Sequence, residues 1–120
     1  MEKKLHKAIV EYINLQYPAT IFNTDLSGLR LTIGQAKVVK KLRSNNSFPD
    51  IVIYKKNQTY GAMFIEVKIE PPYKMNGDIK KKYKPQNDML EKLNKKGYYA
   101  IFGYDFCDIK NKIDWYMSLS

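Results

Sequence analysis

The chain has 120 residues, 44% hydrophobic and 28% charged, a balance typical of one globular domain and unlike that of disordered or membrane proteins. A single cysteine, Cys107, and a single histidine exclude an internal disulfide and a Cys/His zinc cluster, so a metal site would need carboxylates. The excess of 21 Lys and Arg over 12 Asp and Glu gives a formal charge of +9, which indicates either a polyanionic partner or merely a basic protein.

The first half of the chain mixes helix and strand patterns. Residues 2–17 predict a helix that Pro18 ends, because apolar side chains recur there at three- and four-residue steps. His6 lies in this helix and is expected at the surface. A short strand, a second helix and a loop are predicted next, at residues 20–25, 32–42 and 43–48.

The second half contains the clearest strand patterns. Residues 49–56 ("PDIVIYKK") and 60–70 ("YGAMFIEVKIE") are rich in β-branched and aromatic side chains, and the polar segment between them suits a hairpin. The lysine-rich stretch 71–84 is expected to be a polar loop and the most flexible segment. A helix, a third buried strand and a final helix complete a mixed α/β layer, at residues 85–97, 98–104 and 105–119.

Charged residues interrupt the second strand of the hairpin. Because side chains alternate faces along a strand, Glu66, Lys68 and Glu70 share one face. The hairpin would bring Asp50 of the preceding strand within several ångströms of Glu66. Two carboxylates that close repel unless a cation lies between them, and a hard divalent ion such as Mg²⁺ suits oxygen ligands. A neighbouring lysine could position water or stabilise charge during phosphodiester hydrolysis.

Each residue also has a simpler interpretation. The dipeptide Pro49-Asp50 is common in loops, and Glu66 and Lys68 could form a salt bridge on an exposed strand face. Glu70 ends the strand before two prolines, so we expect it to be exposed and give it no metal role. The combination of strands and spacing favours a nuclease over these separate explanations.

Pro49-Asp50 followed by Glu66-Val67-Lys68 resembles the PD-(D/E)XK motif of the restriction-endonuclease-like nucleases. With Glu11 in the first helix and Gln86 in "KPQNDMLEKLNKKGYYAIF", the chain resembles the VRR-NUC (virus-type replication-repair nuclease) branch in its stand-alone phage or bacterial form. The resemblance implies an α/β, restriction-endonuclease-like fold, in which a mixed β-sheet is flanked by helices (αβββαβ core), as one domain over residues 1–120.

The resemblance further implies a Mg²⁺- or Mn²⁺-dependent endodeoxyribonuclease. Lys68 would be catalytic together with the metal-binding carboxylates, and Gln86 would orient Lys68 or a substrate phosphate. The implied metal ligands are Asp50, Glu66, the backbone carbonyl of Val67, and Glu11 either directly or through water.

The lysine run before the Gln86 helix would fall near the catalytic face and contact nucleic-acid phosphates, although such a run is more often a solvated surface. The lysines concerned are Lys80, Lys81, Lys82 and Lys84. By analogy with the family, the substrate would be branched DNA such as a four-way junction, and the enzyme a homodimer. The alternatives are a non-catalytic nucleic-acid-binding module of the same fold and a partner-binding subunit.

The sequence also bears on location. No apolar run approaches the roughly 20 residues of a membrane span. The N-terminal segment has a helical period instead of the unbroken apolar stretch of a signal peptide. We therefore expect a cytoplasmic protein, of a bacterium or of a phage-infected cell, with no membrane partner.

Overall fold

The computed structural model describes residues 2–25, 32–42 and 48–120. Its centre is a four-stranded mixed sheet in the order β1-β2-β3-β4, with antiparallel neighbours except for the parallel pair β3 and β4. The strands are β1 (Phe22–Thr24), β2 (Ile51–Ile53), β3 (Met63–Val67) and β4 (Tyr99–Gly103). The predicted α/β fold class is confirmed.

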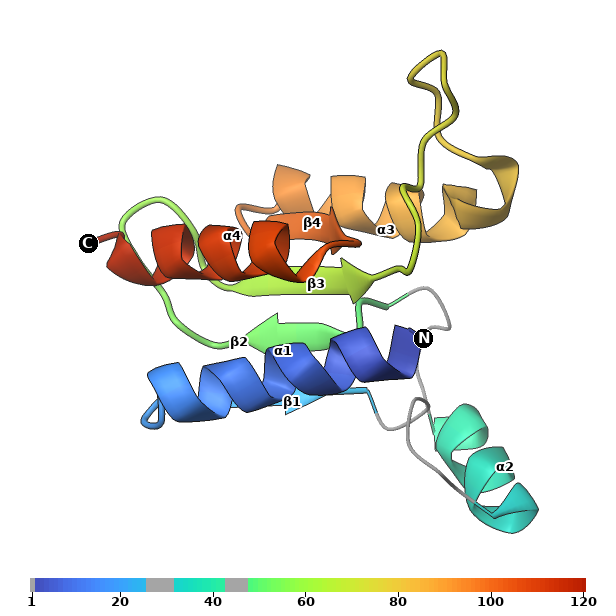
Figure 1. Cartoon of the computed structure of the whole chain (residues 1–120), viewed down its shortest axis with the longest axis horizontal. Helices are drawn as coiled ribbons and strands as arrows, with labels where there is room; N and C mark the ends of the chain where they lie inside the picture. The colour runs from blue at the N-terminus through green and yellow to red at the C-terminus, as the bar shows by residue number, and fades with distance from the viewer. Residues whose placement is uncertain (1, 26–31, 43–47) are drawn as a thin grey trace.

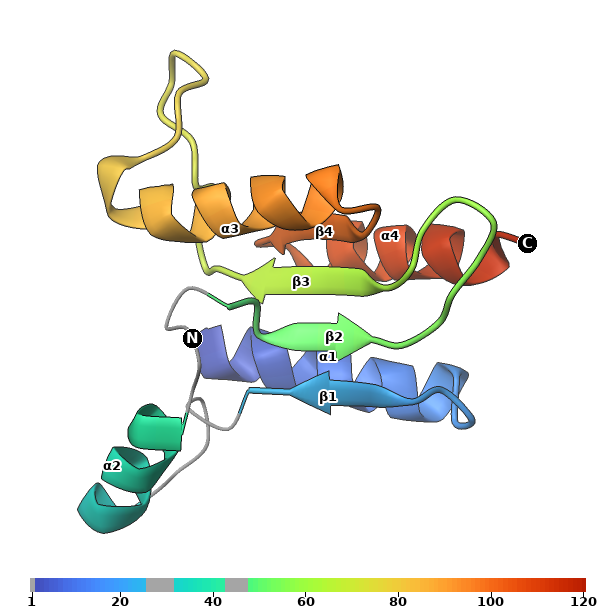
Figure 2. The same ribbon diagram turned by 180° about the vertical axis from the view of Figure 1, so that it is seen from behind.

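Helices cover both faces of the sheet. Helices α1 (Glu2–Gln16) and α4 (Phe106–Ser118) lie together on one face, as Figure 1 shows from the front. Helix α3 (Lys84–Lys95) lies on the opposite face, over β3 and β4 (Figure 2). The predicted helices of residues 2–17, 85–97 and 105–119 are thus confirmed, with ends shifted by one or two residues.

Each face of the sheet has its own apolar cluster. The larger cluster joins the sheet to α1 and α4 and contains Ile9, Ile13, Ile51, Ile53, Met63, Ile65, Val67, Ile109, Ile113 and Tyr116. The smaller joins it to α3 and contains Val52, Ala62, Phe64, Leu90, Leu93, Ala100 and Phe102. Every residue of β3 is buried, because this strand has neighbours on both edges and helices on both faces.

Both hairpin strands are shorter than predicted. Strand β2 spans only Ile51–Ile53, and β3 ends at Val67 instead of reaching Glu70. The backbone N–H of Val67 donates to the Asp50 carboxylate, 2.8 Å away, instead of to a backbone carbonyl of β2. A side chain thus replaces the strand ladder at this point, and the pairing of β2 with β3 stops there.

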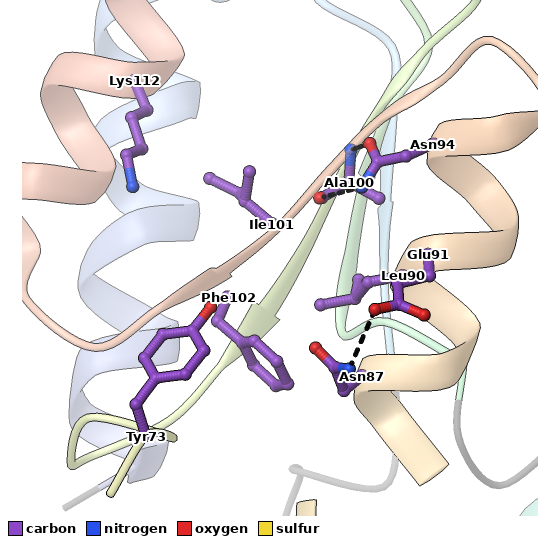
Figure 3. Close-up of a pocket in the computed structure, with 9 residues that line it drawn as sticks. All are labelled: Tyr73, Asn87, Leu90, Glu91, Asn94, Ala100, Ile101, Phe102 and Lys112. Carbon is purple, nitrogen blue, oxygen red and sulfur yellow. Dashed lines mark hydrogen bonds between the residues drawn. The ribbon is translucent and has the colours of Figure 1, made fainter. Parts of the chain in front are cut away.

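The outer edge of β4 is occupied in part by a side chain. The amide of Asn94, in α3, accepts from the Ala100 N–H at 2.9 Å and donates to the Ala100 carbonyl at 3.0 Å. Figure 3 shows both bonds. They lie at a hollow of about 200 Å³, which Tyr73, Phe102 and Lys112 also line. Asn94 therefore takes the place that another strand would occupy beside Ala100.

Helix α2 (Ile33–Leu42) confirms the predicted second helix and lies apart from the sheet in both views (Figures 1 and 2). Its Ile33 and Val38 side chains are exposed. The predicted loop 43–48 falls almost wholly outside the described residues. Within the described part of the chain, no helix has the length and apolar character needed to cross a membrane.

The lysine-rich stretch 71–84 has more regular structure than the sequence predicts. Tyr73 and Ile79 form an antiparallel bridge, and the turn between them contains Gly77 at a φ of 91°, which favours glycine. A short 3₁₀-helix, η2 (Lys81–Tyr83), then leads directly into α3. The stretch is thus a small hairpin and a helical turn.

Asp114 joins α4 to the end of α1. Its carboxylate accepts from the hydroxyls of Tyr12 at 2.5 Å and Tyr17 at 2.7 Å, and it pairs with Lys110 at 3.0 Å. Burial acts to raise the pKa of Asp114, but the two hydroxyl bonds and Lys110 outweigh it, so the pKa is lowered. The stabilisation is therefore present above the ordinary carboxyl pKa and is lost as the pH falls through the lowered value.

Asp114→Asn should destabilise the protein at pH 7 by about 1–2 kcal/mol, because an amide cannot accept both hydroxyl bonds and pair with Lys110. Urea unfolding at several pH values measures this loss, which should shrink below about pH 4. Asp108→Asn is the matched control, since Asp108 forms an exposed ion pair with Lys112 on the same helix. Equal losses in the two variants would contradict a special role for Asp114.

Candidate active site

The predicted site residues meet at the end of the sheet where β3 ends and β2 begins. Ile51 lies opposite Ile65 in the hairpin, and continuing this register places Asp50 opposite Glu66. Helices α1 and α3 also begin at this end of the sheet (Figures 1 and 2). Because the N-terminus of a helix carries partial positive charge, this end of the molecule favours anions.

Glu66 and Lys68 form a buried ion pair. Lys68 Nζ lies 2.9 Å from Glu66 Oε2, and the two side chains are only 9% and 7% exposed. Removing two charges from water is expensive, and their mutual attraction offsets that cost only in part. The alternative interpretation, a salt bridge on an exposed strand face, is thus wrong about the environment of the pair, and the burial of the pair needs another explanation.

The backbone of Lys68 is fixed by β4. The N–H of Lys68 donates to the carbonyl of Gly103 at 2.8 Å, which extends the parallel pairing one residue past β3. A Cβ at Gly103 would lie only 2.5 Å from Ile109, so the close packing of α4 on this strand end requires glycine. Core packing therefore sets the position of Lys68.

Asp50 lies across the strand end from this pair. Its Oδ2 accepts from the Val67 N–H. Because the N–H and C=O of a strand residue point to the same side, the Val67 carbonyl also faces the β2 side, where the Asp50 carboxylate lies. The Asp50 carboxylate and this carbonyl are thus on one side of the strand end, and the charge of Asp50 acts on Glu66.

The electrostatics of the carboxylates follow from burial and proximity. Burial raises the pKa of Glu66, the negative charge of Asp50 raises it further, and Lys68 opposes the rise, with a result of about 8. Burial also raises the pKa of Asp50, against the Val67 N–H, His6 and Lys68. Burial acts to lower the pKa of Lys68, but Glu66 outweighs it and the pKa is raised. Two buried carboxylates with raised pKa values thus face one ammonium, so further positive charge at the site would stabilise their ionised forms.

Helix α1 brings Glu2 near the site instead of the predicted Glu11. Glu11 is exposed and lies roughly 13 Å further along α1 than Glu2, on the opposite side of the helix. The charge of Glu2 instead adds to the raised pKa values of Glu66 and Lys68. Over the described ranges, no group of three or more His, Cys, Asp or Glu residues could hold a metal ion, so Glu11 does not join Asp50 and Glu66.

His6 was expected at the surface but is half-buried beside the site. Its Nε2 pairs with the hydroxyl of Thr24 in β1, and its charge acts to lower the pKa of Asp50. His6 follows Glu2 by four residues, so both lie on one face of α1. This four-residue spacing is the sequence signal that could have identified Glu2 and His6 as neighbours on the face of α1 beside the site.

Gln86 lies in the first turn of α3, as predicted, and one atom of it is unusual. Its Oε1 is buried and accepts no hydrogen bond from any described residue. Tyr83, three residues earlier, places its ring with the centroid 4.8 Å from Lys68 Nζ. The start of α3 thus places the Tyr83 ring against Lys68. The buried Gln86 oxygen lies about one helical turn after Tyr83.

The predicted nucleic-acid-binding lysines divide into three groups. Lys80 and Lys82 both pair with Glu70, at 3.4 Å and 3.0 Å. Lys84 pairs with Asp88 at 3.3 Å, and Lys81 is exposed in η2. Lys82, the Tyr83 hydroxyl and Lys80 lower the pKa of Glu70 to about 2, so Glu70 is an anion that these groups surround.

No protein-family model matches the sequence, and no curated protein matches it. A solved structure described as a VRR_NUC domain protein is similar over 99% of this chain and 89% of that chain, with a TM-score of 0.66 and 18% sequence identity. The two chains share one fold. Because the similarity covers almost the whole of this chain, it includes the hairpin β2-β3, the parallel strand β4 and the helices on both faces of the sheet.

Asp50→Asn should stabilise the metal-free protein at pH 8 by about 1 kcal/mol, a shift of a few degrees in Tm, because it removes the repulsion between two buried carboxylates. Both carboxyl groups have raised pKa values in the folded state, so wild-type stability should fall as the pH rises from about 4.5 to 8. Thermal unfolding in EDTA across this range measures both effects.

The same experiment with excess Mg²⁺ should stabilise the wild type and leave the Asp50→Asn protein unchanged, because an ion bound only by the folded state raises stability. Asp88→Asn, which changes a surface carboxylate paired with Lys84, is the matched control and should respond as the wild type does. A metal-free Asp50→Asn protein less stable than the wild type at pH 8 would show that Asp50 is a structural residue.

Proposed function

We propose that the chain is a metal-dependent nuclease that hydrolyses phosphodiester bonds in DNA. The observation that carries the proposal is the buried Glu66–Lys68 pair with Asp50 across the strand end. Burying two carboxylates and an ammonium at the end of a strand reduces the stability of the fold. Proteins retain such groups at sites where catalysis requires them. The shared VRR_NUC fold and the formal charge of +9 support a polyanionic substrate.

The donor atoms fit Mg²⁺ or Mn²⁺, which we propose as the cofactor. The two carboxylates and the Val67 carbonyl are hard oxygen donors without sulfur or nitrogen, which is the ligand type these ions prefer. Mg²⁺ is usually bound by one or two carboxylates, with water and substrate phosphate completing its shell. A site with Asp50 and Glu66 as its carboxylates therefore suits this ion.

A bound divalent ion would polarise the scissile phosphate and lower the pKa of a water molecule. Lys68 would complement it through its ammonium group. One of its three N–H donors is used by Glu66, which leaves two for water or a phosphate oxygen. Its raised pKa keeps the group charged at neutral pH, which favours stabilisation of negative charge over proton abstraction.

Branched DNA, such as a four-way junction, is the proposed substrate, and a homodimer is the proposed assembly. Cutting two strands of a symmetric junction needs two active sites, which a homodimer with two-fold symmetry supplies. The second candidate function is DNA binding without catalysis. The basic residues around η2 favour it independently of the carboxylates.

Lys68→Ala should lower the rate of DNA cleavage by about 10² to 10³, because it removes the ammonium that would stabilise developing charge. The assay incubates labelled four-way junction, flap and linear duplex with Mg²⁺, Mn²⁺ or EDTA. Glu66→Ala and Asp50→Asn should abolish cleavage and leave DNA binding equal or stronger, since they remove negative charge.

Lys112→Ala is the matched control for Lys68, because Lys112 lies on α4 beside the outer edge of β4. It should cut at the wild-type rate. Binding without cutting under every metal, by a folded wild-type protein, would eliminate the nuclease and leave the non-catalytic module. Loss of folding in the Lys68→Ala protein would instead indicate a structural ion pair.

Gln86→Met should raise the free energy of unfolding by about 1 kcal/mol, because it removes a buried acceptor without a hydrogen-bond donor. If Gln86 orients Lys68 or a phosphate, the same variant should cleave more slowly. Urea unfolding and the cleavage assay are measured together, with Asn87→Met as the neighbouring control. A variant that is less stable and fully active would show that Gln86 only supports the fold.

A further inference from the structure

Three hydrogen-bond donors converge on one oxygen at the edge of the candidate active site. Glu70 Oε1 accepts from the Tyr83 hydroxyl at 2.9 Å and lies 3.0 Å from Lys82 Nζ and 3.4 Å from Lys80 Nζ. The donors come from the end of the 71–80 hairpin and from η2, whereas Glu70 follows β3. Separate parts of the chain thus form one pocket for a negative oxygen.

This cluster contacts the site directly. The Tyr83 ring contacts two ammonium groups, with its centroid 4.8 Å from Lys68 Nζ and 4.9 Å from Lys82 Nζ. The Glu70 side chain is 40% exposed and Lys82 is 64% exposed, so solvent and a large ligand can reach both. An anion bound here would contact Tyr83, whose ring also contacts Lys68.

We propose that Lys80, Lys82 and the Tyr83 hydroxyl form a binding site for a nucleic-acid backbone phosphate, and that Glu70 occupies this site in the free protein. Binding would then exchange one anion for another: the phosphate takes the three donors and the Glu70 carboxylate turns to solvent. The proposal rests on the proposed function for its ligand, since it names where the substrate backbone lies next to Lys68.

The charges and donors of the cluster suit a backbone phosphate as well as the carboxylate that they now hold. Two ammonium groups face one carboxylate, which leaves a net charge of about +1 in the cluster. A phosphodiester also carries one negative charge, shared by two non-bridging oxygens on a tetrahedral phosphorus, so the lysines and the hydroxyl could bind different oxygens, whereas all three now share Glu70 Oε1. Glu70 keeps the lysines together while no ligand is bound, and it weakens binding because it must be displaced.

Glu70→Gln tests this exchange, because it removes the charge and keeps an oxygen for the Tyr83 hydroxyl. It should bind labelled DNA in EDTA about threefold to tenfold more tightly than the wild type at low salt. The gain should shrink as salt rises, because screening weakens exposed charges. Fluorescence anisotropy of a labelled duplex and of a four-way junction, at several salt concentrations, measures both effects.

Asp108→Asn is the matched control, since it adds the same charge by changing a carboxylate of similar exposure on α4. It should gain much less affinity. In a Lys80→Gln/Lys82→Gln background, Glu70→Gln should give no gain, and these two substitutions alone should lower the slope of log affinity against log salt by about one per lysine. Comparing the two backgrounds shows whether the gain in affinity from Glu70→Gln depends on these two lysines.

A Glu70→Gln protein that binds DNA no more tightly than Asp108→Asn, or more weakly than the wild type, would overturn the proposal and assign Glu70 a purely supporting role. This outcome is distinct from failure of the proposed function. A protein that never cleaves DNA but shows the expected gain retains the phosphate site, whereas one that cleaves without the gain retains only the nuclease.

Discussion

The ion pair between Glu66 and Lys68 is the constraint around which the rest of the molecule is arranged. The pair lies at the end of a strand that is buried on both faces, where charge is costly. Its geometry depends on packing: the Gly103 carbonyl holds the Lys68 backbone, and Ile109 closes over that glycine. A hydrophobic core thus fixes two charged groups that would otherwise have many conformations, and rigid placement is what catalysis by charge stabilisation requires.

The sequence predicted this part of the site because the interactions are local. Asp50 and Glu66 belong to two strands joined by a short connection, so strand alternation and hairpin register are enough to bring them together. The same alternation placed Glu66 and Lys68 on one face. Burial of the pair was not predictable, since it depends on α3 and β4, which are distant in sequence.

Contacts between distant elements account for the differences. The helical period of α1 gave its apolar face but not its position along the sheet, and that position decides whether Glu2 or Glu11 lies near Glu66. The same long-range packing brings His6 to Asp50. Similarly, the polar composition of residues 71–84 predicted a loop, whereas Glu70 draws its lysines into an ordered cluster. The composition of a segment indicates how readily water solvates it. It does not show which residue from another segment its side chains will contact.

Asn94 has a consequence for assembly. Strand β4 is an edge of the sheet, and exposed edges allow chains to polymerise by continuing one another's sheets. By bonding to both backbone groups of Ala100, the Asn94 amide ends the ladder within its own chain. The opposite edge, β1, has only three residues, which gives a second chain little to pair with. Two subunits of this protein would therefore associate more readily through helices or loops than through a shared sheet.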